Sequence, residues 1–119
     1  PVGEAVLCAA ADRQQGLDWT DTAAIVGTAG LEPQLAQLAL RSPTSLVAIS
    51  ESHRAARRMT DIIDVLAADL RLARLLCRLP DFAEGVRAVL VDKDQKPQWR
   101  PKALEGVDRA SIRAVIGVA

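Results

Sequence analysis

The sequence predicts an all-α protein of about five to seven helices and no sheet. Half of its 119 residues are hydrophobic and only 3% are aromatic, and the hydrophobic residues are mostly Ala, Leu, Val and Ile. Because Ala and Leu have high helix propensities, this composition favours helices. Apolar residues recur at three- and four-residue steps, whereas the alternation with a period of two that is typical of strands is nowhere sustained.

We divide the chain into a leading segment, residues 1–40, and a C-terminal helical module, residues 41–119. The leading segment is expected to form short helices, at residues 1–14, 18–30 and 31–40. Turn-forming residues at 16–30 would separate the first of these helices from the rest of the chain. Pro33 suits the first turn of the third helix, where its missing N–H would have no helical partner in any case.

Two longer helices are predicted to open the module. Ser42 followed by Pro43 is an N-cap with a proline at the first helical position, which predicts a helix over residues 42–58. After a turn, residues 60–79 contain the longest periodic segment of the chain. Its apolar stripe consists of Ile62, Ile63, Leu66, Leu70, Ala73 and Cys77. We interpret this stripe as core, and part of it would be exposed if a partner domain were missing.

Local signals also place the remaining elements. Pro80 ends the periodic helix, because proline cannot continue its hydrogen-bond ladder. Asp81 and Glu84 are predicted to cap the helix that follows as a capping-box-like pair. Trp99 lies between two prolines in an extended tail, and its large ring is expected to anchor that tail onto the helices. Asp108 would cap a last helix.

Charge and hydropathy exclude some functions. The 15 basic residues balance the 15 acidic ones, and nucleic-acid binding would need more positive charge and more stacking aromatics. We therefore interpret the basic cluster of His53, Arg54, Arg57 and Arg58 as a solvated face. No apolar run approaches the roughly 20 residues of a membrane span. Neither a nucleic acid nor a membrane is expected as a partner.

The cysteines suggest a reducing compartment. Cys8 and Cys77 both lie among apolar neighbours, which predicts buried free thiols rather than a disulfide. No signal peptide is expected either, because the first residues lack a basic stretch followed by an apolar one. These observations favour a cytoplasmic location. His53, the one histidine, and the two distant cysteines do not have the spacing of metal ligands, so no metal site is expected.

Three segments also carry a resemblance. SPTSL, at residues 42–46, is similar to a serine-proline helix start in the enoyl-CoA hydratase/isomerase (crotonase) superfamily. ADLRLARLLCR, at residues 68–78, resembles the E-(Y/F)-R-(L/M)-A helix of 3-hydroxyisobutyryl-CoA hydrolases, with Asp69 for Glu and Leu70 for the aromatic residue. DFAEGVRAVLVDKDQKPQWRP, at residues 81–101, resembles the C-terminal signature of the same hydrolases, and its DKDxxPxW ending favours that branch over the hydratases.

The resemblance implies a parent enzyme that hydrolyses or hydrates acyl-CoA thioesters. Such enzymes hold the thioester carbonyl between two backbone N–H groups, and a carboxylate handles the water or the proton. Those groups belong to an upstream α/β core with a glycine-rich segment, which this sequence does not contain. We therefore expect no catalytic residue here. Coenzyme A thioester would be the substrate of the parent enzyme, and no cofactor is expected.

The resemblance also implies a role for the helices as a cover over the acyl-CoA site. The expected partners are the catalytic core of the same protein or of a neighbouring subunit, or a second copy of the chain. Lys93 lies near the sequence position of a lysine that contacts a phosphate in the hydratases. Val89 occupies the position of an aromatic residue that contacts the adenine there. Arg87 is the second phosphate candidate, unless it pairs with a carboxylate. Asp92 and Asp94 would weaken an anion site at Lys93.

Three hypotheses follow. The chain is the C-terminal region of a 3-hydroxyisobutyryl-CoA hydrolase-like enzyme, which would release a hydroxy acid and coenzyme A, as in valine breakdown. Alternatively it is the same region of an enoyl-CoA hydratase or isomerase, and the upstream carboxylates would distinguish the two. A third hypothesis is a stand-alone helical interaction module that has no activity.

Overall fold

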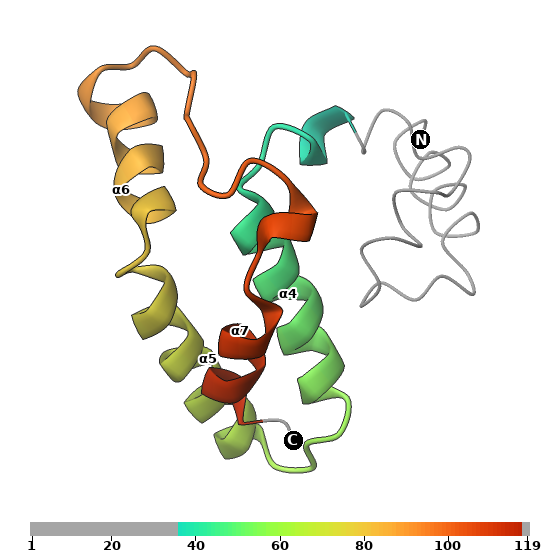
Figure 1. Ribbon diagram of the computed structural model, residues 1–119. Coiled ribbons are helices and arrows are strands. Elements are labelled where there is room, and N and C mark those ends of the chain that lie inside the picture. The colour runs from blue at the N-terminus through green and yellow to red at the C-terminus, as the bar shows by residue number, and fades with distance from the viewer. Residues whose placement is uncertain (1–35, 118–119) are drawn as a thin grey trace, which may run out of the picture.

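The computed structural model describes residues 36–117 (Figure 1). In chain order the elements are α4 (Pro43–Ala56), α5 (Ile62–Leu76), α6 (Pro80–Val86), the π-helix η1 (Arg87–Val91), the 3₁₀-helix η2 (Leu104–Gly106) and α7 (Arg109–Ile116). No strand occurs within the described range, which confirms the all-α prediction. The leading helices predicted at 1–14 and 18–30 lie outside it. Of the one predicted at 31–40, residues 36–38 are helical.

The helices form a small antiparallel bundle. In Figure 1, α4 and α5 run in opposite directions and are joined by a short loop at one end of the molecule. The α6–η1 helix continues beyond the far end of α5, and an extended segment then leads back toward α4. After η2, α7 packs against both α4 and α5. The last helix therefore closes the bundle at the end opposite to η1.

Local capping explains where three helices begin. The Ser42 side chain accepts a hydrogen bond from the backbone N–H of Ser45 at 3.3 Å, and Pro43 occupies the first turn of α4. Asp61 caps α5 in the same way. Asp108 caps α7, as predicted, by accepting from the N–H of Ser111 at 3.1 Å. Short-range sequence signals thus fix these helix starts.

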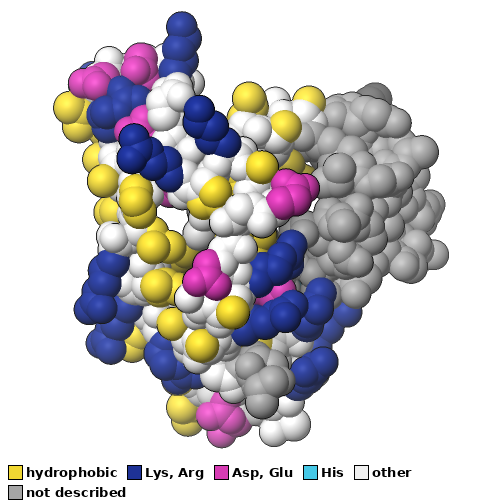
Figure 2. Space-filling model, viewed as in Figure 1, with side chains coloured by type: hydrophobic (Ala, Val, Ile, Leu, Met, Phe, Trp, Pro, Cys, Tyr) yellow, Lys and Arg dark blue, Asp and Glu magenta, His cyan; other side chains and the backbone are white. Residues whose placement is uncertain are grey.

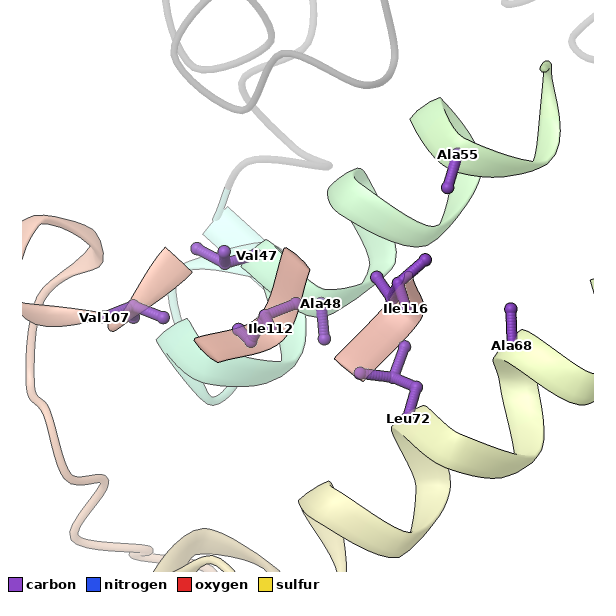
Figure 3. Close-up of a cluster of buried hydrophobic side chains, with 8 residues drawn as sticks. All are labelled: Val47, Ala48, Ala55, Ala68, Leu72, Val107, Ile112 and Ile116. Atoms are coloured by element: carbon purple, nitrogen blue, oxygen red, sulfur yellow. The ribbon is translucent and has the colours of Figure 1, made fainter. Parts of the chain in front are cut away.

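The core lies between α4, α5 and α7 (Figure 3). Its buried hydrophobic side chains are Val47, Ala48 and Ala55 of α4, Ala68 and Leu72 of α5, and Val107, Ile112 and Ile116 at the C-terminal end. Alanine at three of these positions lets the helices approach closely around Ile112 and Ile116, which are almost fully buried. The core is small, and its largest fully buried side chains, Ile112 and Ile116, belong to α7.

Arginines fasten α7 to both of its neighbours. Arg113 donates to the Glu51 carboxylate of α4 at 2.9 and 3.0 Å, and Arg109 donates to it at 3.2 Å. On the other side, Arg71 of α5 donates at 2.9 Å to each of the last two carbonyl oxygens of α7. These carbonyls have no partner within the helix, so the guanidinium serves as a C-terminal cap.

The apolar stripe of α5 does not form the core, contrary to our interpretation. Four of its large side chains are more than half exposed: Ile62 (68%), Ile63 (68%), Leu66 (60%) and Leu70 (53%). The face toward α4 and α7 instead carries Ala68 and Leu72. Cys77, at the end of the stripe, is exposed rather than buried, and Cys8 lies outside the described residues. The stripe is the surface that we expected to be open if a partner were missing.

The predicted capping box at α6 is also wrong. The N-cap is Leu79, without a side-chain hydrogen bond, and Pro80 occupies the first helical turn. Asp81 lies one position further on, is 8% exposed, and is engaged with distant parts of the chain. Glu84 binds Arg87 instead of turning back toward the helix start. Asp81 thus binds residues that are distant in the sequence, and Glu84 binds an arginine three positions further along, so neither carboxylate caps α6.

Candidate functional site

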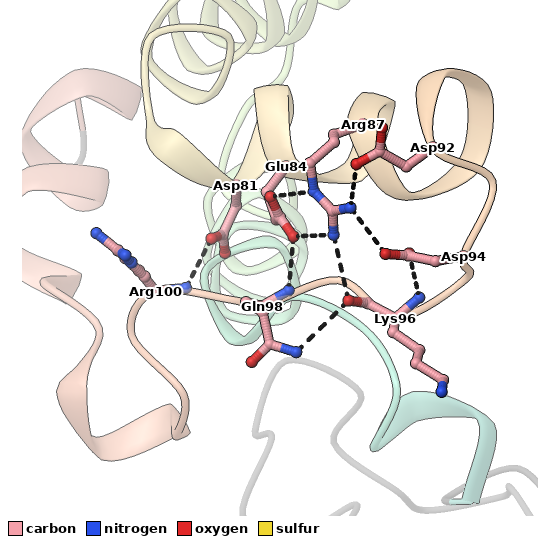
Figure 4. A network of polar contacts seen from close by, with 8 residues as sticks. All are labelled: Asp81, Glu84, Arg87, Asp92, Asp94, Lys96, Gln98 and Arg100. Atoms are coloured by element: carbon pink, nitrogen blue, oxygen red, sulfur yellow. Dashed lines mark hydrogen bonds and ion pairs between the residues drawn. The ribbon is translucent and has the colours of Figure 1, made fainter.

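The end of the α6–η1 helix carries a dense polar network around Arg87 (Figure 4). The guanidinium donates to both carboxylate oxygens of Glu84, with Nε–Oε2 at 2.9 Å and Nη2–Oε1 at 2.6 Å. Its Nη1 donates to Asp92 at 2.7 Å and to Asp94 at 2.8 Å. Nη2 also donates to the carbonyl oxygen of Lys96 at 3.3 Å. One arginine therefore connects the helix to the loop that follows it.

The backbone of this segment is unusual. The helix widens into the five-residue π-helix η1, and the N–H of Asp92 donates to the carbonyl oxygen of Arg87 at 2.8 Å. Beyond it, Lys93 (φ 57°) and Gln95 (φ 58°) adopt the left-handed conformation, which is uncommon for residues other than glycine. Single-turn π-helices and strained residues gather at functional sites more often than elsewhere. This loop is thus the first place to look for a site.

Electrostatics keep the network ionised. The hydrogen bonds from Arg87 lower the pKa of the Glu84 carboxyl to about 2, with a further contribution from the Gln98 N–H. Arg87 also lowers the pKa of Asp94, while the carboxylates raise the pKa of Arg87 above its usual value. At neutral pH the guanidinium is therefore charged and its N–H groups are occupied by carboxylates.

The two residues that the sequence singled out for phosphate contact lie in this one segment but differ in their surroundings. Arg87 pairs with Glu84 of its own helix, in line with the alternative that it binds a carboxylate, and also with the loop residues Asp92 and Asp94, which was not expected. Lys93 is exposed, and its ammonium makes no salt bridge within the described residues. Val89 is 50% exposed on the helix that leads to the loop.

A second polar cluster, which sequence reasoning missed, holds the tail beside α4. Asp81 accepts from the Ser42 hydroxyl at 2.5 Å and from the N–H of Arg100 at 2.7 Å. The Trp99 indole donates to the carbonyl oxygen of Leu40 at 3.0 Å, and its ring lies over Gly85 of α6. Trp99 is therefore the anchor of the tail that the sequence predicted. No local pattern signalled the role of Asp81, because its partners are far away in the sequence.

Between these elements lies an open groove of about 530 Å³. Its walls come from the start of α4, the end of α5, the α6–η1 helix and the tail, and they are mainly apolar: Leu76, Leu79, Phe82, Val86, Val89 and Trp99. Figure 2 shows apolar side chains gathered along the α5–α6 side of the molecule, with basic and acidic groups at its ends. A groove of this character suits an apolar partner surface.

Within residues 36–117, no helix is long and apolar enough to cross a membrane. Nor does any group of three or more His, Cys, Asp and Glu side chains in this part of the chain have an arrangement that could hold a metal ion. His53 and Arg58, from the basic cluster, are exposed on α4 and in the turn after it.

Several curated proteins are similar in sequence to this chain. A 3-hydroxyisobutyryl-CoA hydrolase, mitochondrial, of Gallus gallus is 46% identical over 74 residues, which are 62% of this chain and 19% of that protein. The corresponding protein of Danio rerio is 42% identical over 86 residues, 72% of this chain and 22% of that protein. The 3-hydroxyisobutyryl-CoA hydrolase-like protein 5 of Arabidopsis thaliana is 36% identical over 92 residues, 75% of this chain and 24% of that protein.

This chain thus spans about a fifth of the length of the curated relatives that it matches. No solved structure matches it. The sequence profile of the enoyl-CoA hydratase/isomerase family matches residues 17–116, which include all of the helices described above. The chain therefore belongs to the enoyl-CoA hydratase/isomerase family, and the relatives named above are 3-hydroxyisobutyryl-CoA hydrolases and a 3-hydroxyisobutyryl-CoA hydrolase-like protein.

Proposed function

We propose that this chain is the C-terminal helical region of a 3-hydroxyisobutyryl-CoA hydrolase-like enzyme, in which it covers the coenzyme A site. The observation that carries the proposal is the similarity to hydrolases of that name over 74 and 86 residues of this chain, although the chain spans only about a fifth of their length. The reaction would be attack of water on the thioester carbonyl, which releases coenzyme A and a hydroxy acid. We assign no catalytic residue to this chain.

The cover would meet the catalytic core through apolar surface. The stripe of α5 and the exposed side chains Phe82, Val86, Val89, Leu90 and Val91 of α6–η1 support this assignment. Large exposed apolar surface of this kind marks interaction sites in soluble proteins. The partner is the core of the same protein or of a neighbouring subunit, and the second case would make the enzyme a homo-oligomer.

Within the cover, we assign the contact with coenzyme A to Lys93. A lysine ammonium is a compact positive charge that suits a phosphate, and Lys93 is exposed without an ion-pair partner among the described residues. Arg87 was the other candidate. Its donors already serve Glu84, Asp92 and Asp94, so a phosphate would have to displace carboxylates from it.

The test is the substrate preference of the complete protein that contains this chain. We expect it to hydrolyse 3-hydroxyisobutyryl-CoA, which is measured as free coenzyme A thiol, and to leave crotonyl-CoA largely unhydrated. Hydration of the enoyl-CoA without thioester hydrolysis would assign the region to a hydratase instead. An expressed protein whose intact mass and reading frame equal this chain alone would favour the stand-alone helical module.

Location needs a separate measurement. We expected a cytoplasmic protein, and the names of several relatives contain the word mitochondrial. Fractionation of cells that express the complete protein, with an antibody against residues 92–102, would locate it directly.

A further inference from the structure

The sequence around Lys93 raises an objection to the phosphate contact proposed above. Asp92 and Asp94 flank this lysine, and two adjacent carboxylates would either pair with its ammonium or repel an incoming phosphate. The positions of the side chains remove the objection. Both aspartates direct Oδ2 at Nη1 of Arg87, at 2.7 and 2.8 Å (Figure 4). Neither forms a salt bridge with Lys93.

The same arginine also holds the loop backbone. It donates to the carbonyl oxygen of Lys96 at 3.3 Å, while the Asp94 carboxylate that it binds accepts from the N–H of Lys96 at 2.9 Å. A backbone bond from Gln95 to the carbonyl oxygen of Ala88, at 3.0 Å, closes the turn. Left-handed residues such as Lys93 persist only where the surroundings over-determine them. Here the hydrogen bonds of Arg87 to Asp92, Asp94 and the Lys96 carbonyl hold the loop in this conformation.

Glu84 completes the arrangement from the helix side. Its carboxylate fixes the guanidinium in a bidentate pair and also accepts from the Gln98 N–H at 2.9 Å, so the arginine cannot easily swing toward solvent. Without Arg87, three carboxylates would lie together with no guanidinium between them. Asp92 and Asp94 would then be free to pair with the lysines of the loop, Lys93 and Lys96.

We propose that Arg87 is a positioning residue for coenzyme A. By binding Asp92 and Asp94 and the loop carbonyl, it keeps Lys93 unpaired and in the conformation that presents its ammonium to a phosphate. Arg87 itself does not touch the ligand. This inference rests on the proposed function, because it specifies how the phosphate contact assigned to Lys93 is prepared.

The experiment uses the complete enzyme and two substrates that share one thioester, the acyl-CoA and the corresponding acyl-pantetheine, which lacks the phosphates. The variants are Arg87→Met, Lys93→Met and the double variant. Lys102→Met is the control, because Lys102 is an exposed lysine in the same tail and outside the network. Arg87→Lys, which keeps the charge but loses the fork, serves as a milder second variant.

Arg87→Met and Lys93→Met should each raise KM for the acyl-CoA about tenfold, the effect of losing one charge-assisted contact, with kcat nearly unchanged. The double variant should be no worse than either single one, because both remove the same contact. Turnover of the acyl-pantetheine should stay at the wild-type level, and Lys102→Met should resemble wild type with both substrates. Arg87→Lys should fall between wild type and Arg87→Met.

Several results would overturn the inference while leaving the proposed function intact. One is an unchanged KM for the acyl-CoA in Arg87→Met or in Lys93→Met. Another is an increase of KM in the double variant that equals the two single increases combined. A third is an equal loss of turnover with the acyl-CoA and the acyl-pantetheine in the arginine variants, which would indicate a merely structural role. Failure of the wild-type enzyme to hydrolyse the acyl-CoA at all would instead refute the proposed function.

Discussion

Two buried carboxylates join parts of the chain that lie far apart in the sequence. Glu51, with a side chain 3% exposed, receives hydrogen bonds from two arginines of α7. Asp81 receives the Ser42 hydroxyl and the N–H of Arg100. The hydrophobic core of the described residues is small. We therefore expect these charge-assisted hydrogen bonds to contribute much to holding α7 and the tail in place.

Glu51→Gln should destabilise the chain by about 1–2 kcal/mol at pH 7, less than for a fully buried ion pair because both arginines are partly exposed. The hydrogen bond from Arg113 lowers the pKa of Glu51 in the folded state. The ionised Glu51 carboxylate therefore contributes its full stabilisation above the pKa that it has in the unfolded chain. This stabilisation is lost as the pH falls through the lower pKa that it has in the folded chain. Urea unfolding should show the gap between wild type and variant closing below about pH 4.5.

The exposed Glu105 provides the control for this measurement. Glu105→Gln should have the same free energy of unfolding as wild type at pH 7 and at pH 3. A gap for Glu51→Gln that is constant down to pH 3 would mean that its carboxylate charge does not contribute.

Asp81→Ala should be more costly, because it leaves a buried hydroxyl and a backbone N–H without their acceptor. We expect a loss of about 2–3 kcal/mol in the free energy of unfolding. Asp69→Ala, at an exposed position of α5, should change it by less than about 0.5 kcal/mol. Equal effects of the two substitutions would show that the Asp81 contacts are not maintained in solution.

At the scale of elements, the helices differ in how far the sequence could foresee them. The starts of α4 and α7 follow from Ser42 and Asp108, because capping is a local interaction. The buried face of α5 does not follow from its pattern. Periodicity reveals the apolar stripe, but Leu72 on another face is what α7 covers. Which face packs depends on the neighbouring helices, and no residue of α5 encodes that choice alone.

The candidate site shows the same division. Its location at the end of the helix that contains EGVRA, residues 84–88, could be inferred from the motif, and so could the two basic candidates, Arg87 and Lys93. The pairing of Arg87 with the two aspartates could not be foreseen, because it depends on a π-helix and on two left-handed residues that no local rule predicts. The sequence placed Asp92 and Asp94 against Lys93, whereas the fold turns them toward Arg87.

Replacing two glycines by alanine should have opposite effects on the stability of the chain. In α6, a Cβ on Gly85 would meet the Trp99 ring at 3.5 Å, an ordinary contact, so Gly85→Ala should stabilise the chain by about 0.5–1 kcal/mol through helix propensity. A Cβ on Gly106 of η2 would lie 2.8 Å from the Cβ of Pro101, so Gly106→Ala should destabilise it. Thermal unfolding of both variants tests the pair. A stabilised Gly106→Ala, or a destabilised Gly85→Ala, would contradict the packing around the tail.

At the scale of the whole molecule, the described residues enclose a small core and leave much apolar surface uncovered. Along α5 and α6–η1, the exposed large side chains form one side of the molecule (Figure 2). The groove beside Trp99 adjoins the same side. Such an arrangement suits a module that is completed by another surface more than one that functions in isolation.

The isolated chain should therefore bind an apolar dye such as anilinonaphthalene sulfonate, and should self-associate as its concentration rises. Leu66→Asp and Leu70→Asp, in the exposed stripe, should reduce both effects, since they replace apolar surface with charge. Sedimentation velocity and dye fluorescence measure them. A monomeric chain without dye binding would mean that the stripe is covered by another part of the chain.

The central claim is that the stripe of α5 packs against a catalytic core, and the reactivity of Cys77 tests it most directly. This thiol lies at the end of the stripe and is exposed in the chain by itself. Its rate of labelling by a maleimide, followed by peptide mass spectrometry, should be close to the rate in urea for the chain alone. In the complete enzyme it should be strongly slowed, and Leu66→Asp should restore part of the reactivity. Equal labelling of Cys77 in the chain and in the complete enzyme would contradict the account.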